Sequence, residues 1–411
     1  MIPRLTAFVF LLIALPVLAQ NPPESVDMAG VLTLARKASP RLALERQNIA
    51  VARAERRTAS AYPNPTISYN HSHQPRAFTD FEGARAQEIS IEQPLLIAGQ
   101  RGARVEAAEQ GIRAAQAYFD ASGNELAADA GAAFIALLAA QEKHATLMAS
   151  MTELDHLRNI VAGRQMSGMA SQYDLLRLDI EQATWHTRSV ESKAELADRQ
   201  AHLATLLGFS DWRPHGTGEL LPLKNVDMGV SGNPDKHPVL IAARREEAAA
   251  RANTEVAHRE RFPNVSLTAG RFWTSAPYGA SNTIGISIEV PIFGTRGGAF
   301  DRAKAEEQSA GLRRYLAEAK VQADVQRYTA LVTQRTAAFD HFEQQLEPRL
   351  PSLKQMAEDA YRLGKSSIVE LLDATRMRYE TQLGYLELVS GLAEAQLRLQ
   401  AARGDFVSWL E

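Results

Sequence analysis

The chain repeats its own motifs about 200 residues apart, and this duplication constrains the fold more than any other sequence feature. Tyr62-Pro63-Asn64-Pro65 returns as Phe262-Pro263-Asn264-Val265, and Gly168-x-x-Ser171-x-x-Asp174 returns as Gly364-x-x-Ser367-x-x-Glu370. Each half follows the order helix, strand, strand, long helix, turn, helix. A unit used twice is typical of a symmetric wall or tube, and less so of a cleft built around a few catalytic side chains.

The first residues have the pattern of a secretory signal peptide, which we assign to residues 1–19. A short positive segment, 1–4, precedes an apolar run, 5–14, and a small-residue cleavage site follows Ala19. No other stretch approaches ~20 consecutive apolar residues, so no spanning helix is expected. The chain has no Cys, so we expect no disulfide, no thiolate metal site and no lipid attachment through a Cys.

The charge of the chain argues against a nucleic-acid partner. Its 45 basic and 48 acidic residues are interspersed and leave a net charge of −3, without the basic footprint that such partners need.

Two segments predict helices that are too long for a compact globule. Residues 102–164 contain no Pro and only four internal glycines, which predicts a rod on the order of 90 Å at ~1.5 Å per residue. The equivalent segment, 299–363, carries Pro348 and Pro351, which should kink or break it. Shorter helices are predicted at 27–59, 171–207, 238–261 and 367–403. On the helices alone, a soluble coiled-coil rod remains an alternative.

Four short segments alternate apolar and polar residues and predict two β-hairpins. They are residues 66–70, 88–92, 265–269 and 284–290, joined within each half by polar loops at 74–85 and 275–283. Four strands cannot close a barrel, but hairpins from several chains could, with apolar residues toward lipid and Ser, Glu and Asn toward a wet lumen. A half-exposed soluble sheet would show the same alternation.

Aromatic residues lie near the predicted strand ends. Tyr69, Phe272, Trp273 and Tyr278 occupy positions where an interfacial aromatic girdle of a membrane barrel would sit.

The motifs resemble those of the TolC-type outer-membrane efflux proteins over essentially the whole mature chain. The resemblance rests on the Pro-Asn-Pro entry to the first strand, the Gln93-Pro94…Gly99-Gln100-Arg101 exit from the second, and the segment from Tyr361 to Ala374. It implies a mainly α fold with a small β part. Three chains would form an α-barrel continuous with a 12-stranded outer-membrane β-barrel, four strands per chain.

Within this family the sequence looks most similar to the CzcC-like heavy-metal branch. The cues are Glu92-Gln93-Pro94, Val290-Pro291-Ile292-Phe293 and the final Ala401-Ala402-Arg403-Gly404. The branch usually has Gly-Lys-Arg where this chain has Gly99-Gln100-Arg101. The resemblance to this branch implies a heavy-metal cation as the substrate, although this departure counts against it. Drug or solvent efflux and type I protein secretion are the alternatives, and a periplasmic structural coiled-coil protein is the non-channel alternative.

The resemblance also implies partners, a location and a domain division. It implies a homotrimer in outer-membrane lipid with a large periplasmic extension, which docks onto a periplasmic adaptor (membrane fusion) protein and an RND-type inner-membrane pump. After the signal peptide we expect repeat 1 at 20–207, an equatorial linker at 208–236 and repeat 2 at 237–411. No cofactor is expected.

Two acidic residues are candidates for a pore constriction. Glu370 and Asp373 are three residues apart, so they share one face of a helix, and three chains would place six carboxylates around the axis. The family carries acidic rings at the matching positions. Taken alone, both could equally be solvated surface acids.

The resemblance supplies further candidate residues near the helical tips. Polar links that close the periplasmic end match Asp174, Tyr361 and Ser366, where better-known members carry a basic residue in place of Ser366. The turns that would dock the adaptor contain Gly168, Ser171, Gly364 and Ser367.

Metal-binding and enzymatic motifs are weak or absent. His71 and His73 are two apart on a strand and therefore share a face, a spacing compatible with a metal but too little to predict a site. Gly364-Lys365-Ser366 resembles the end of a P-loop, but Asp359 stands where that motif needs Gly. Since no zinc-protease, dinucleotide or nucleophile-elbow motif occurs, an enzyme is not expected.

Overall fold

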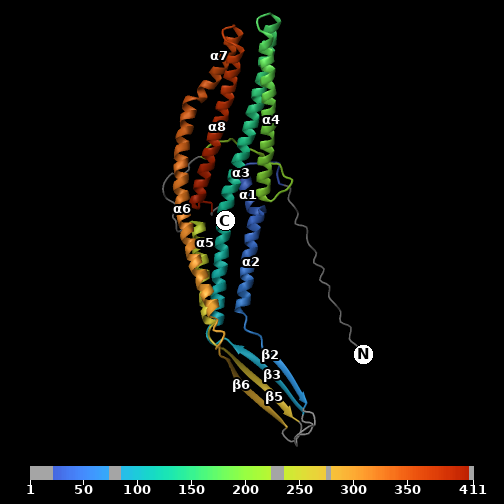
Figure 1. Ribbon diagram of the computed structural model, residues 1–411, viewed down its shortest axis with the longest axis vertical. Coiled ribbons are helices and arrows are strands. Elements are labelled where there is room, and N and C mark those ends of the chain that lie inside the picture. The colour runs from blue at the N-terminus through green and yellow to red at the C-terminus, as the bar shows by residue number, and fades with distance from the viewer. Residues whose placement is uncertain (1–21, 74–84, 224–235, 275–278, 407–411) are drawn as a thin grey trace, which may run out of the picture.

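The computed structural model describes residues 22–73, 85–223, 236–274 and 279–406, which form an elongated molecule (Figure 1). A β-sheet occupies one end, two helix-turn-helix tips occupy the other, and long helices run between them. The helices are α1 (Met28–Ala38), α2 (Pro40–Ser60), α3 (Gln100–Met166), α4 (Gln172–Leu207), α5 (Pro238–Arg259), α6 (Gly297–Gln345), η2 (Glu347–Arg349), α7 (Leu350–Arg362) and α8 (Ile368–Arg403). The strands are β1 (Ser25–Val26), β2 (Thr66–His73), β3 (Arg85–Leu95), β4 (His215–Gly216), β5 (Asn264–Thr274) and β6 (Ala280–Glu289).

The long helix α3 is the spine of the chain and confirms the predicted rod. Its 67 residues extend about 100 Å at ~1.5 Å per residue. It packs against α2 and α5 toward the sheet and against α4 and α8 toward the tips. One stretch of α3 is long and apolar enough to cross a membrane, but 72% of that stretch is buried inside the protein, as expected for a core helix.

Prolines set two helix breaks, of which the sequence reading anticipated one. The rod of the second half ends at Gln345 and resumes as α7, as Pro348 and Pro351 predict. The continuous helix predicted at 27–59 is wrong, because the chain divides into α1 and α2 at Ser39-Pro40. Ser39 adopts an extended conformation (φ −60°, ψ 125°), the geometry that a following proline favours.

The four predicted strands form one antiparallel sheet in the order β2-β3-β5-β6. Its register aligns Ile67, Ile91, Ala269 and Ile284 in one row across all four strands. This row belongs to an apolar face that is exposed along the whole sheet, and Ile284 is 82% exposed. The strands β2 and β6 are the two edges and leave their outer backbone groups unpaired within the sheet.

The opposite face of the sheet is polar and partly occluded. The neighbouring row aligns Thr66, Glu92 and Thr268, and the residues of β3 and β5 on this face are less exposed than their apolar neighbours. The predicted alternation is therefore confirmed.

Phe272 and Trp273 lie near the end of β5, as predicted, whereas Tyr69 lies in the middle of β2. Tyr69 and Trp273 lie on the apolar face, whereas Phe272 pairs with Glu88 on the polar face, because one residue along a strand reverses the side. Tyr278, the signal peptide and the loop residues 74–84 and 275–278 lie outside the described residues.

In each repeat, a glycine–proline contact at the middle of the molecule joins the end of the last helix to the start of an earlier helix. Gly208 ends α4 in the left-handed conformation (φ 88°), and a Cβ there would lie 2.5 Å from Cδ of Pro40. Gly404 ends α8 in the same way (φ 79°), and its Cβ would lie 2.6 Å from Cδ of Pro238. A glycine is therefore required at each helix end for conformation and for space.

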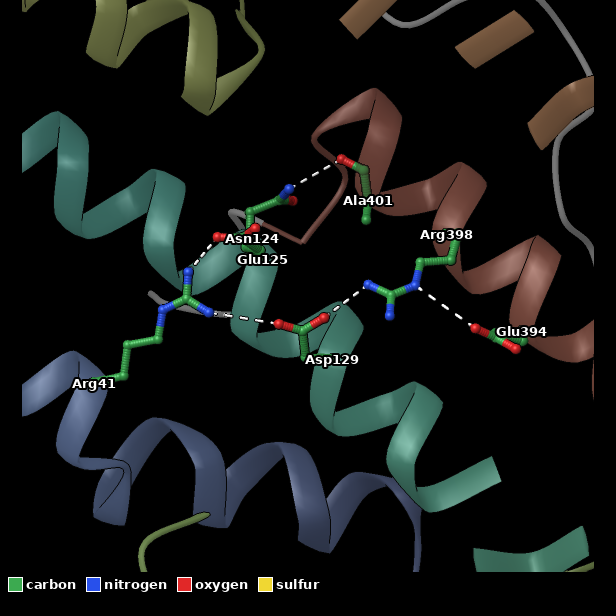
Figure 2. A network of polar contacts seen from close by, with 7 residues as sticks. All are labelled: Arg41, Asn124, Glu125, Asp129, Glu394, Arg398 and Ala401. Carbon is green, nitrogen blue, oxygen red and sulfur yellow. Dashed lines mark hydrogen bonds and ion pairs between the residues drawn. The ribbon is translucent and has the colours of Figure 1, made fainter. Parts of the chain in front are cut away.

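A polar network joins the two repeats at the same level (Figure 2). Asp129 of α3 accepts a hydrogen bond from Arg398 of α8 at 2.8 Å and a longer one from Arg41 of α2 at 3.5 Å. The Asn124 amide donates to the carbonyl oxygen of Ala401 at 3.0 Å. The middle of α3 thus ties the first helices of the chain to the last one.

Candidate functional site

The two tips are built by the same local chemistry. At the first tip, Gly168 adopts a positive φ of 75°, and Ser171 begins α4 with a capping box. The Ser171 backbone N–H donates to the Asp174 carboxylate at 3.0 Å, and the Asp174 N–H donates to the Ser171 hydroxyl at 3.2 Å. These reciprocal bonds satisfy backbone groups that the first turn of α4 leaves unpaired.

The second tip repeats this arrangement. Gly364 has a φ of 71°, and Ser367 begins α8. The Ser367 N–H donates to the Glu370 carboxylate at 2.9 Å, and the Glu370 N–H donates to the Ser367 hydroxyl at 3.3 Å. The duplicated Gly-x-x-Ser-x-x-Asp/Glu motif is therefore a helix stop followed by a helix start.

The capping boxes give two predicted site residues a local role that the sequence reading missed. Asp174 was assigned to a gate link and Glu370 to a constriction, but both carboxylates also cap their own helices. The spacing Ser-x-x-Asp/Glu before an apolar segment was the signal that could have shown this.

The predicted acidic pair lies on an exposed face of α8. Glu370 and Asp373 are both exposed, while Leu371 and Leu372 between them are 2% and 3% exposed. Met377, which is 53% exposed, continues the same stripe one turn further along. The structure thus confirms that the two carboxylates share a solvent-facing side, and their role in a constriction stays a prediction.

Tyr361, another of the predicted gate residues, is buried at the base of the second tip. It is 4% exposed, and its hydroxyl has no hydrogen-bond partner among the residues that the structure describes. Burial and the nearby Asp174 carboxylate raise the pKa of Tyr361, and the Arg164 guanidinium acts in the opposite direction. Asp174 and Tyr361 therefore lie close together within one chain, while the hydroxyl of Ser366 is also buried without a described partner.

Arg164 connects the two tips and was missed by sequence reasoning. Its guanidinium lies 4.7 Å from the centroid of the Tyr361 ring and donates to the carbonyl oxygens of Tyr361 and Arg362, the latter at 3.1 Å. It also donates to the Met169 carbonyl of its own turn at 3.3 Å. One side chain of α3 thus caps the end of α7, which lies almost 200 residues away in the sequence.

The polar face of the sheet carries only acidic charges within the described strands. These are Glu88, Glu92 and Glu289, and Glu289 accepts a hydrogen bond from Asn264 at 2.8 Å. His71 and His73 lie on the other face, opposite Gln87 and Arg85. In the described parts of the chain, no group of three or more His, Asp or Glu side chains could hold a metal ion.

Comparisons with known proteins agree with this architecture. The family model described as outer membrane efflux protein matches residues 31–209 and 235–405. Among solved structures, the outer-membrane channel OprN superposes with a TM-score of 0.79 at 20% identity, covering 93% of this chain and 91% of OprN. A CusC structure, described in terms of transmembrane channel formation, gives a TM-score of 0.77 at 20% identity, covering 94% of this chain and 95% of that one.

The curated relatives include heavy-metal resistance proteins. The chain is 22% identical over 338 residues to the cobalt-zinc-cadmium resistance protein CzcC of Cupriavidus metallidurans, covering 79% of this chain and 78% of CzcC. It is 24% identical over 328 residues to the nickel and cobalt resistance protein CnrC of the same organism, covering 79% and 77%.

The fold is thus that of outer-membrane channels in which a helical barrel continues a β-barrel. The chain belongs to the outer membrane efflux protein family. It is an outer-membrane protein and not an enzyme, as the sequence reading predicted.

Proposed function

We propose that this chain is the outer-membrane channel of a tripartite efflux system and passively conducts heavy-metal cations to the exterior. A periplasmic adaptor and an RND-type inner-membrane pump would supply the cations. The observation that carries the cation assignment is the polar face of the sheet, where the described charges, Glu88, Glu92 and Glu289, are all negative. Rings of acidic side chains favour cations in a pore.

The two edge strands of the sheet support assembly of the chain into a homotrimer. The strands β2 and β6 are free to pair with neighbouring copies, and three four-stranded sheets would close a barrel of twelve strands. Apolar stripes lie exposed on the outer helices. One stripe comprises Leu312, Tyr315 and Leu316 of α6, each at least 64% exposed, and α2 carries Leu44 at 61%. Packing of such stripes between copies would bury them.

The proposed domain division follows the duplication. Repeat 1 spans 20–207, repeat 2 spans 237–411, and 208–236 links them. The two separate segments matched by the family model and the equivalent closures at Gly208 and Gly404 support this division.

The tips would provide the gate and the docking site. Glu370 and Asp373 would form the acidic constriction, because they share an exposed face of α8. Asp174, Tyr361 and Ser366 would contribute the closing links, and the unpartnered hydroxyl groups of Tyr361 and Ser366 support such a role.

The two tip turns would contact the adaptor. They contain Gly168 with Ser171 and Gly364 with Ser367. Met166 and Leu363 beside them are 86% and 68% exposed, so each turn presents an apolar side chain to a partner.

A deletion strain tests the substrate. Loss of the gene should lower tolerance to cobalt, zinc, cadmium or nickel and raise the cellular content of the same metal, and the wild-type chain should restore both. Replacement of Glu88, Glu92 and Glu289 by Gln should restore them incompletely. The matched control is Glu306→Gln, since Glu306 lies on α6 and pairs with an exposed arginine.

Other cargo would give a different pattern in the same experiment. The chain is 24% identical over 343 residues to the pyoverdine export outer membrane protein OpmQ of Pseudomonas aeruginosa, covering 74% of this chain and 67% of OpmQ. Unchanged metal tolerance with lost tolerance to organic compounds would replace the metal assignment by drug or solvent efflux. Lost secretion of a protein would replace it by type I secretion. The structural coiled-coil alternative does not describe a member of this channel family.

A further inference from the structure

The long helix α3 lies between two flanks that are each made of two helices. Helices α2 and α4 pack along one side of α3, and helices α5 and α8 pack along the other (Figure 1). The two helices of a flank meet end to end, because Gly208 of α4 contacts Pro40 of α2 and Gly404 after α8 contacts Pro238 of α5. Two further sides of α3 remain, and they differ in what covers them.

One of these sides is covered at the middle of the molecule. The segments 24–38 and 212–219, which contain α1, β1 and β4, form a belt across it. Residues of the belt share a hydrophobic cluster with Leu126, Ala130 and Phe134 of α3. The Gly216 N–H of β4 donates to the Gln141 side chain of α3 at 2.7 Å, and that side chain donates back to the Gly216 carbonyl oxygen at 3.0 Å.

The opposite side of α3 stays uncovered along one narrow stripe. Between residues 123 and 140, all residues of α3 are buried except five, which are Glu125, Asp129, Ala132, Ala136 and Ala139. These five recur every three or four residues, so they share one face of the helix. The three alanines form the floor of a cavity of about 250 Å³ whose walls come from α4 and α8. The stripe is therefore open at the level where the belt covers the other side.

The polar network of Figure 2 lies on this stripe. Arg41 reaches Asp129 from one flank at 3.5 Å, and Arg398 reaches it from the other flank at 2.8 Å. Arg41 also contacts Glu125, and Arg398 lies 3.9 Å from Glu394. The five side chains are between 29% and 58% exposed, so their charges act on the surrounding water. Three carboxylates stand against two guanidinium groups, which leaves the network a net charge of −1.

We propose that the uncovered stripe of α3 faces the bore of the tube and that the network on it sets ion selectivity at the middle of the tube. A belt packed inside the bore would obstruct it, so the belt lies outside and the opposite stripe lies inside. Three chains would then place three networks around the axis, with a combined charge of −3, and acidic charges that line a pore favour cations. This inference rests on the proposed channel function and adds a selectivity level that is separate from the sheet and the tips.

A pair of substitutions with opposite charge effects tests the proposal in planar bilayers under a potassium chloride gradient. Glu125→Gln raises the charge of the network from −1 to 0, and Arg41→Gln lowers it from −1 to −2. The reversal potential should therefore move toward zero with Glu125→Gln and toward the potassium equilibrium value with Arg41→Gln. Both substitutions remove the same ion pair, so general loosening of the helices would move the potential in the same direction in both variants.

Matched controls lie on the belt, at the same level but on the covered side of α3. Glu219→Gln and Arg213→Gln each remove one exposed charge there, and both should leave the reversal potential unchanged. Where Glu125→Gln or Arg41→Gln does not assemble, Glu394→Gln and Arg398→Gln provide a second pair with opposite charge effects.

The possible failures of this experiment are distinguishable. A reversal potential that is unchanged in the network variants, or that moves in the same direction in both, would overturn the proposal and leave the channel function standing. A change in the belt variants alone would place the belt in the bore and would also overturn it. A protein that conducts no ions would refute the channel function itself, and this inference with it.

Discussion

In the described part of the chain, four glycines end helices in the left-handed conformation, two of them at crowded positions and two at open positions. Gly208 and Gly404 face a proline ring at 2.5 and 2.6 Å from an added Cβ. At Gly168 no atom of the described residues lies within 4 Å of that position, and at Gly364 the nearest atom, of Arg164, is in ordinary contact at 3.5 Å. Replacement by Ala therefore imposes the same backbone cost at all four and an additional steric cost at two.

The expected magnitudes follow from these two costs. A left-handed Ala costs about 1–2 kcal/mol relative to Gly, and forcing a methyl group against a rigid ring adds about 1–3 kcal/mol. Gly168→Ala should therefore lower stability by about 1–2 kcal/mol and Gly208→Ala by about 2–5 kcal/mol. For units of 150–250 residues, 1 kcal/mol corresponds to about 2–4 °C in unfolding temperature, so Gly208→Ala should unfold about 2–12 °C below Gly168→Ala.

Far-ultraviolet circular dichroism in detergent, at one scan rate, measures the four apparent unfolding temperatures. Gly404→Ala should behave like Gly208→Ala, and Gly364→Ala should behave like Gly168→Ala. Equal decreases in unfolding temperature at all four positions would show that the proline contacts add no steric cost at Gly208 and Gly404. A larger loss at the tips than at the middle would refute the reasoning altogether.

Three further outcomes are expected. Replacing Glu370 and Asp373 by Ala should weaken cation preference and divalent-cation block in planar-bilayer recordings, and unchanged selectivity would contradict the acidic ring. A bulky residue at Gly168 or Gly364 should impair adaptor docking in a pull-down while the oligomer survives in detergent, whereas loss of the oligomer would make these glycines structural. Burial opposes ionisation of Glu181, but hydrogen bonds from Arg376 and Trp185 outweigh burial and lower its pKa. The pairing of Glu181 therefore stabilises the fold fully above the unfolded-state pKa of about 4.3. This stabilisation is lost as pH falls through the folded-state pKa of Glu181. The difference in unfolding temperature between the parent and Glu181→Gln should therefore shrink below about pH 4, and a difference independent of pH would contradict the pairing.

The elements of the fold could be predicted because their signals are local. Alternation located the four strands, the absence of Pro located α3, and Pro348 and Pro351 located the break before α7. The break at Ser39-Pro40 had an equally local signal and was overlooked.

One junction shows where motif alignment fails. Gly99-Gln100-Arg101-Gly102 recurs in the second half as Gly294-Thr295-Arg296-Gly297, which aligns Gly294 with Gly99. In the structure, however, the residue that precedes α6 in the left-handed conformation of Gly99 is Arg296, with a φ of 52°. Its guanidinium donates to the carbonyl oxygen of Glu260 at 2.8 Å. This tertiary contact accompanies a left-handed conformation that arginine disfavours. Local sequence preferences therefore could not have predicted that the left-handed residue before α6 is Arg296.

The contacts between the helix pairs α3–α4 and α7–α8 could not be predicted for a related reason. Glu181 and Arg376 are 195 residues apart, and Arg164 reaches the end of α7 from 197 residues away. Composition and periodicity carry no information on which charged residues of two helices meet. The family resemblance supplied Tyr361 and Asp174, which the structure brings close together, but it supplied neither arginine.

The reversal potential of the purified protein in a planar bilayer, under a potassium chloride gradient, tests the central claim most directly. A tube whose sheet and tips present acidic faces should conduct ions, with a reversal potential displaced toward the potassium equilibrium value. Replacing Glu88, Glu92 and Glu289 by Gln should move that potential toward zero. An absence of conductance, or a potential displaced toward the chloride value, would contradict the account of this protein as a cation-conducting efflux channel.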